Sequence, residues 1–107
     1  MDGRIEPELE QIVERLVRAY HPERIFLFGS AAREDRNPDS DIDVLVVVGD
    51  EAPLELRSSR LAYRALRGTG LAVDVLVWSR SCFESRRHLR ASLSSTIATE
   101  GRLLYAA

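Results

Sequence analysis

The run Val44-Leu-Val-Val-Val48 constrains the fold most, because five consecutive apolar residues of this kind suit a strand that is covered on both faces. Asp41 and Asp43 precede the run and are separated by Ile42. Alternate residues of a strand share a face, so the two aspartates point the same way. At an effective dielectric of about 20 and a separation of about 5 Å, their repulsion is on the order of 3 kcal/mol. The pair therefore needs either one protonated carboxyl group or a divalent cation, and oxygen ligands suit Mg²⁺ or Mn²⁺.

A third carboxylate falls in the next long apolar stretch. Leu71 to Trp78 is predicted to be a buried strand, and Asp74 interrupts it. An ionised side chain inside such a strand is expensive unless it is paired or bound to metal. If this strand lies beside the strand of Asp41 and Asp43, the three carboxylates converge. Such a cluster can hold two cations about 3.5–4 Å apart, which is the arrangement used for in-line phosphoryl or nucleotidyl displacement.

A short turn ahead of the paired aspartates is a candidate phosphate site. Residues 24–28 are predicted to form a short apolar strand that ends at Gly29, where the backbone can approach a ligand closely. Ser30 adds a hydroxyl and a backbone N–H. Arg33 has two possible roles, as a counter-ion that anchors the aspartates or as a direct phosphate contact. Ser40 is predicted to tie down the polar loop of residues 35–39 through a side-chain hydrogen bond.

Four further segments are predicted to be helices, because they show helical spacing of apolar residues or helix-end signals: residues 5–20, 53–67, 82–90 and 92–100. Ser79 or Ser81 is predicted to cap the third of them, with Glu84 completing a capping box. Leu103 to Tyr105 should then pack back on the body. This order of elements predicts an α/β protein with a mixed β-sheet flanked by helices.

Arginine supplies all 15 basic residues, since the chain has no lysine. Arg57, Arg60, Arg64 and Arg67 recur at steps of three and four within the predicted helix 53–67, so they should form one stripe. A solvated helix face explains this stripe. A docking surface for an acidic partner or a nucleotide tail is the alternative.

Composition bounds the class of protein. A length of 107 residues and a hydrophobic content of 45% predict one domain, residues 1–107, with a small core. The net charge of −2 does not suit a polycation built for nucleic acid, so no direct nucleic-acid binding is expected. The single Cys82 excludes an internal disulfide and a cysteine zinc site. No signal peptide or long apolar span is recognised, which predicts a cytoplasmic protein without membrane contact.

Taken together, these motifs resemble the nucleotidyltransferase superfamily of DNA polymerase beta, and most of all its shortest branch, the minimal nucleotidyltransferases (MNT proteins). The residues that carry the resemblance are Gly29-Ser30, Ala32-Arg33, Ser40-Asp41-Ile42-Asp43 and Asp74. The similarity extends from about Ile5 to Tyr105. Glu34 departs from the family pattern, which usually has Gly after the motif arginine. The departure weakens the expected turn and places an acid near a phosphate site, but it removes no candidate metal ligand.

The resemblance implies a polymerase beta palm-like nucleotidyltransferase fold and a two-Mg²⁺ site in which Mn²⁺ could replace Mg²⁺. Asp41, Asp43 and Asp74 would be both the metal ligands and the catalytic residues, and Asp74 is also placed to accept a proton. The implied nucleotide-binding residues are Gly29, Ser30, Arg33 and Ser40. The implied reaction transfers a nucleoside monophosphate from an NTP to a hydroxyl group and releases pyrophosphate. ATP is the favoured donor.

The implied partner is a second protein. MNT proteins are commonly encoded beside a HEPN-domain ribonuclease toxin and act as its antitoxin, so the resemblance implies adenylylation of a tyrosine on such a toxin. Two alternatives stay open: a non-catalytic nucleotide-binding antitoxin that masks its partner, and a small-molecule nucleotidyltransferase of the aminoglycoside type that assembles as a dimer. The donor base, the acceptor, the number of nucleotides transferred and the oligomeric state are left open by the sequence.

Overall fold

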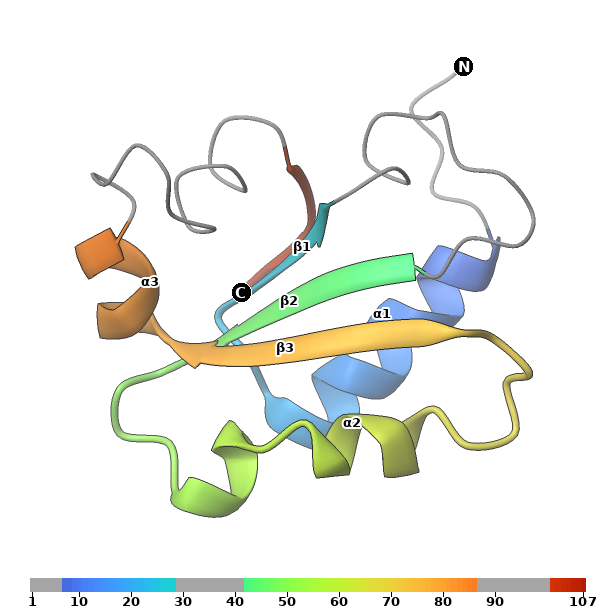
Figure 1. The fold of residues 1–107 in the computed structure, drawn as a ribbon, viewed down its shortest axis with the longest axis horizontal. Helices are drawn as coiled ribbons and strands as arrows, with labels where there is room; N and C mark the ends of the chain where they lie inside the picture. Colours follow the sequence, from blue (N-terminus) through green and yellow to red (C-terminus); the bar gives the residue numbers. More distant parts are fainter. Residues whose placement is uncertain (1–6, 29–41, 87–100) are drawn as a thin grey trace.

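The computed structural model describes residues 7–28, 42–86 and 101–107. Four strands of these ranges form one sheet in the order β3-β2-β1-β4 (Figure 1). β1 pairs antiparallel with β2 and with β4, whereas β2 and β3 are parallel. The elements in chain order are α1 (Pro7–Tyr20), β1 (Arg24–Phe28), β2 (Ile42–Val48), the 3₁₀ helix η2 (Leu54–Arg57), α2 (Arg60–Ala65), β3 (Val73–Ser79), α3 (Arg80–Arg86) and β4 (Arg102–Ala106). The predicted α/β class with a mixed, helix-flanked sheet is confirmed.

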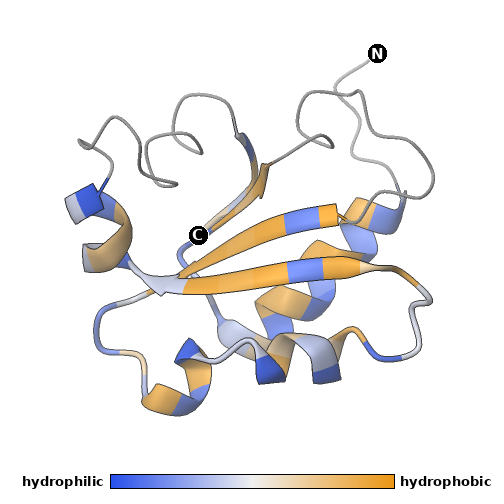
Figure 2. Cartoon of the chain, viewed as in Figure 1, coloured by the Kyte–Doolittle hydropathy of each residue, from blue (hydrophilic) through white to orange (hydrophobic). Residues whose placement is uncertain are grey.

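β2 lies inside the sheet and is covered on both faces, as its apolar run predicts. The even-numbered side chains Ile42 to Val48 pack with α1 and α2 in the larger hydrophobic cluster. The odd-numbered Leu45 and Val47 pack on the opposite face with Phe26 and with Phe83 of α3. Figure 1 shows α1 passing behind the sheet, and Figure 2 shows that β2 is hydrophobic over most of its length. The strand is therefore fixed in register by two separate cores.

The first helix covers one face of this sheet. Its buried side chains recur at helical spacing and are Leu9, Ile12, Leu16 and Tyr20. Pro7 stands at its first residue, where the missing N–H is not needed. The helix ends before His21, which has a φ of 48°, and Pro22. Burial of an aliphatic side chain such as Ile12 contributes roughly 1.5–3 kcal/mol, so packing rather than propensity holds α1 in place.

The predicted single helix over residues 53–67 is wrong, because the chain forms η2 and α2 with a break at Ser58. Ser58 is extended, with a ψ of 142°. Its carbonyl accepts a hydrogen bond from the buried Tyr20 hydroxyl, and its Oγ accepts one from the Arg60 N–H at 3.1 Å. A distant tyrosine and a local serine contact together override the helical pattern.

The predicted arginine stripe is broken at the same place. Arg57 folds back onto the preceding turn, where its Nε donates to the Ala52 carbonyl at 3.0 Å and its Nη2 to the Asp50 carbonyl at 2.5 Å. Arg60 and Arg64 are exposed on α2. Arg57 therefore braces a loop and does not continue a row with Arg60, Arg64 and the exposed Arg67.

β3 and β4 are the two edge strands of this sheet. The predicted strand 71–78 is found as Val73–Ser79, but the prediction that it is buried is wrong, since only Val75 is buried and Asp74 is exposed. Residues 103–105 do fold back, and they do so as part of β4, a strand that the sequence analysis does not predict. Gly68 and Gly70, with φ of 89° and 73°, provide the turn that leads from α2 into β3. No helix in the described ranges is long and apolar enough to span a bilayer.

Candidate functional site

Asp43 and Asp74 stand opposite each other on the neighbouring parallel strands β2 and β3. Partners in register on adjacent strands point to the same face, and adjacent strands are about 4.8 Å apart. Figure 2 shows the result as a hydrophilic band that crosses both strands within otherwise hydrophobic stretches. Asp43 is partly buried and Asp74 is exposed. The strand of Asp74 thus lies beside the strand of Asp43, which is the condition on which the predicted convergence of carboxylates depends.

The register also places the ends of two strands at this site. Phe28, the last residue of β1, is the antiparallel partner of Asp43. Ile42 opens β2, and its backbone N–H donates to the Ala72 carbonyl at 2.9 Å, just before β3 begins. The chain therefore leaves β1 and enters β2 at the same end of the sheet as the carboxylate pair. The other predicted site residues, Gly29, Ser30, Arg33, Ser40 and Asp41, lie outside the described residues.

Tyr63 is a contact of the site that the sequence analysis misses. Its hydroxyl, carried by α2, donates to Asp74 Oδ1 at 3.2 Å. The tyrosine side chain is 50% exposed. Ala62 is the buried residue of α2, so the spacing within the helix indicates only that Tyr63 lies outside the buried face. The contact depends on how the turn after α2 brings β3 alongside, which no local signal predicts.

The carboxylate pair supplies the kind of ligand that a hard divalent cation prefers. Both side chains offer oxygen atoms, and Mg²⁺ is commonly bound through one or two carboxylates together with substrate phosphates. A cation between them would also relieve the repulsion of two like charges placed side by side. Within residues 7–28, 42–86 and 101–107, no cluster of three or more His, Cys, Asp or Glu could hold a metal ion. The described part of the chain therefore provides two of the three predicted ligands.

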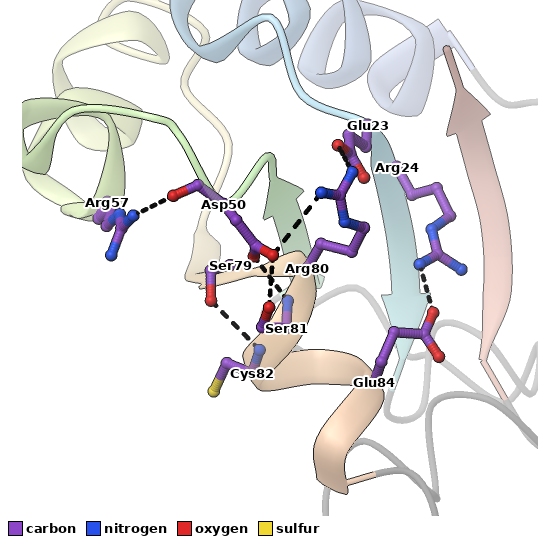
Figure 3. Close-up of polar contacts among 9 residues, drawn as sticks. All are labelled: Glu23, Arg24, Asp50, Arg57, Ser79, Arg80, Ser81, Cys82 and Glu84. Atoms are coloured by element: carbon purple, nitrogen blue, oxygen red, sulfur yellow. Dashed lines mark hydrogen bonds and ion pairs between the residues drawn. The ribbon is translucent and has the colours of Figure 1, made fainter.

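A second polar cluster lies at the opposite end of β2 and β3, where α3 begins (Figure 3). Asp50 accepts hydrogen bonds from the Ser81 backbone N–H at 2.8 Å and from the Ser81 hydroxyl. Arg80 lies 3.6 Å from Asp50 and makes a 2.6 Å ion pair with Glu23. The Ser81 hydroxyl, then its backbone N–H, and more weakly Arg80 and Arg57 hold the pKa of Asp50 below its usual value. These acids are satisfied by protein donors, so the cluster fixes the start of α3.

The helix cap within this cluster corrects one prediction. Ser79 Oγ accepts a hydrogen bond from the Cys82 N–H at 3.2 Å, so Ser79 is the capping residue of the two candidates. Glu84 does not complete a capping box with Ser81. It makes a 2.8 Å ion pair with Arg24, whose guanidinium lies 5.3 Å from the Phe83 ring centroid. Figure 3 shows both arrangements around the first turns of α3.

A groove of about 500 Å³ lies elsewhere, between α1 and α2. Its lining includes Arg15, whose guanidinium donates to the carbonyls of Ala65 at 3.0 Å and Arg67 at 3.2 Å. These bonds satisfy carbonyl groups at the end of α2. The two helices cover the face of the even-numbered β2 residues, whereas Asp43 points to the other face. The groove is therefore separate from the carboxylate pair.

Comparison with known proteins identifies the family. The nucleotidyltransferase domain family matches residues 8–104. A protein of Methanocaldococcus jannaschii, provisionally named a protein adenylyltransferase, is 29% identical over 102 residues, which cover 94% of this chain and 97% of that protein.

Two solved structures share the fold. The crystal structure of a protein from Sulfolobus solfataricus, provisionally described as a nucleotidyltransferase, has a TM-score of 0.57 at 23% identity and covers 99% of this chain and 93% of its own. A crystal structure of a toxin–antitoxin with AMP-PNP has a TM-score of 0.60 at 24% identity, with 92% of this chain and 73% of that chain covered. With the family match over nearly its whole length, the chain belongs to the nucleotidyltransferase domain family and is a nucleotidyltransferase.

Proposed function

We propose that this nucleotidyltransferase transfers AMP from ATP to a tyrosine hydroxyl of a partner HEPN-domain toxin, and so acts as its antitoxin. The observation that carries the proposal is the in-register pairing of Asp43 with Asp74 on β2 and β3. Two likenesses support the donor and the acceptor class. The Methanocaldococcus jannaschii relative is named for protein adenylyltransferase activity, and one structural neighbour is a toxin–antitoxin crystallised with AMP-PNP.

In this proposal residues 1–107 act as one catalytic domain, and the site divides into a carboxylate part and a phosphate part. Asp41, Asp43 and Asp74 would hold two Mg²⁺ ions, which when bound stabilise charge on the attacking and leaving oxygens. Gly29 and Ser30 would bind the β- and γ-phosphates through backbone N–H groups and the hydroxyl. Ser40 would fix the turn before the aspartates, and Arg33 would pair with either the aspartates or a phosphate. Asp43 and Asp74 both offer oxygen ligands, which Mg²⁺ prefers, and this supports the assignment of the metal ligands.

The proposed step is a single displacement at phosphorus. The acceptor oxygen forms a bond to the α-phosphorus while the bond from that phosphorus to the oxygen bridging to the β-phosphate breaks, and pyrophosphate leaves. Asp74 accepts the proton of the acceptor hydroxyl. Asp74 is exposed on an edge strand, so an acceptor carried by another protein can approach it without opening the core.

The test uses the purified chain with α-labelled ATP, Mg²⁺ and the protein encoded by the neighbouring gene. We expect label on a tyrosine of that partner, and its loss for Asp43→Asn, which removes one of the proposed metal-binding carboxylates. Glu55→Gln is the matched control, since Glu55 is an exposed acid on η2 and belongs to neither of the strands that carry the carboxylate pair. It should transfer label as the unmodified chain does.

Two outcomes would contradict the proposal. Neutralisation of the partner by the unmodified chain and by Asp43→Asn alike, with no label transferred, would mean that the chain masks its partner by binding. Transfer of label to an aminoglycoside, with none to the partner protein, would identify a small-molecule enzyme.

A further inference from the structure

The Tyr63 hydroxyl contacts Asp74 of the proposed catalytic pair from α2, outside the strands β2 and β3 that carry Asp43 and Asp74. It donates to Asp74 Oδ1 at 3.2 Å, so its proton is directed at the carboxylate assigned as the base. The phenol belongs to α2, whose buried residue is Ala62, and it is half exposed. The side chain therefore reaches the edge of the sheet that β3 forms, and the core does not enclose it.

The other two tyrosines of the chain are placed differently, and the comparison isolates Tyr63. Tyr20 is fully buried, and its hydroxyl donates to the Ser58 carbonyl. Burial raises the pKa of Tyr20, a backbone hydrogen bond at Ala62 lowers it by less, and the charge interaction with Tyr63 raises it by less again. Tyr105 lies on β4, and β1 and β2 stand between that strand and β3. Of the three tyrosines, Tyr63 is the one whose hydroxyl donates a hydrogen bond to Asp74.

We propose that Tyr63 is an acceptor within the chain itself, so that the protein transfers a nucleoside monophosphate to its own Tyr63 hydroxyl when no partner is present. The inference rests on the proposed function, because it uses the same carboxylate pair and the same acceptor chemistry. A phenol already hydrogen-bonded to the base needs no further docking, and such preorganisation lowers the entropic part of a barrier.

The step balances without any additional reagent. Tyr63 Oη forms a bond to the α-phosphorus of the nucleoside triphosphate, and the bond from that phosphorus to the pyrophosphate oxygen breaks. Pyrophosphate leaves with the electron pair, and the phenolic proton passes to Asp74 Oδ1. The product is a phosphodiester on Tyr63, and it removes the donor that now faces Asp74.

The test uses the full chain alone with ATP and Mg²⁺, followed by intact-mass measurement and peptide fragmentation. We expect one adenylyl adduct located on Tyr63. Tyr63→Phe and Asp43→Asn should abolish the adduct, whereas Tyr105→Phe should carry it as the unmodified chain does. Circular dichroism of Tyr63→Phe serves as the folding control, and an exposed phenol-to-phenyl change should leave it unaltered.

A parallel reaction with the partner protein separates failure of this inference from failure of the proposed function. If the partner is labelled but Tyr63 carries no adduct, self-transfer is overturned and the proposed function stands. The same holds if Tyr63 carries no adduct and Tyr63→Phe merely slows labelling of the partner, since Tyr63 would then only position Asp74. An adduct on another residue also overturns the inference. If neither the partner nor Tyr63 is labelled, both proposals fail together.

Discussion

Replacement of Asp74 by asparagine should stabilise the metal-free protein while weakening its stabilisation by Mg²⁺. The change keeps the shape of the side chain, and the amide oxygen can still accept the hydrogen bond of the Tyr63 hydroxyl. What it removes is one of the two like charges that face each other across β2 and β3. Function and stability should therefore respond in opposite directions at this position.

The size of the effect follows from the register and the exposure. With carboxylates about 5 Å apart, Coulomb's law gives about 3 kcal/mol at an effective dielectric of 20 and about 0.8 kcal/mol in water. Asp74 is exposed, so the aqueous limit is closer, and like charges directly opposite on neighbouring strands destabilise by similar amounts. We expect Asp74→Asn to raise the free energy of unfolding by about 1 kcal/mol, which corresponds to about 4 °C in Tm.

The assay is thermal unfolding in EDTA and again in Mg²⁺. At a concentration tenfold above the dissociation constant, bound metal should add about 1.4 kcal/mol to the unmodified chain and much less to Asp74→Asn. Glu55→Gln should follow the unmodified chain under both conditions. An Asp74→Asn variant that is no more stable in EDTA, and that gains as much from Mg²⁺ as the unmodified chain, would refute the reasoning.

Two further predictions concern the packing that holds the site in place. Asp50→Asn replaces one of the two oxygens that accept hydrogen bonds from Ser81 and removes the charge facing Arg80, so it should lower the unfolding free energy at pH 7. Because the folded pKa of Asp50 is depressed, its contribution is fully present above its ordinary value of 3.8 and is lost as pH falls through the lower folded value. Urea unfolding at several pH values should therefore show the deficit of Asp50→Asn shrinking in acid, and a deficit that grows there would contradict the assignment. Phe83→Ala leaves a cavity in the cluster where the Phe83 and Phe26 rings stack with centroids 5.3 Å apart. It should lower the free energy of unfolding by about 3–5 kcal/mol in the same assay. A cost below about 1 kcal/mol would mean that α3 does not depend on this cluster.

Much of the sheet could be predicted because its signals are local. The apolar run 44–48 indicates burial on both faces, and the structure divides its side chains between two clusters. The break at Ser58 could not be predicted in this way, because it depends on a hydroxyl 38 positions away, that of Tyr20. β4 is not predicted for a related reason. It is a short strand in which only Leu104 is buried, and its extended conformation depends on pairing with β1.

In the candidate site, too, the features with local sequence signals could be predicted and those that depend on distant contacts could not. Asp43 is recognisable as one of two alternate acids at the start of an apolar strand, and Asp74 as an acid that interrupts one; the parallel register brings them together. The exposure of Asp74 was not foreseen, since an apolar sequence does not reveal that its strand lies at an edge. Tyr63 was not foreseen either, because its contact with Asp74 spans the turn at residues 66–72. The roles of Asp41 and of residues 29–40 stay predictions.

The central claim is that Asp43 and Asp74 share a divalent cation bound to the nucleotide. The most direct measurement is a crystal structure of the chain with Mn²⁺ and a non-hydrolysable ATP analogue, in which anomalous scattering locates the metal. We expect a cation that is coordinated by carboxylate oxygens of both residues at close to the Mg²⁺ distance of about 2.1 Å. A triphosphate and cation bound elsewhere, with Asp74 outside the coordination sphere, would contradict it.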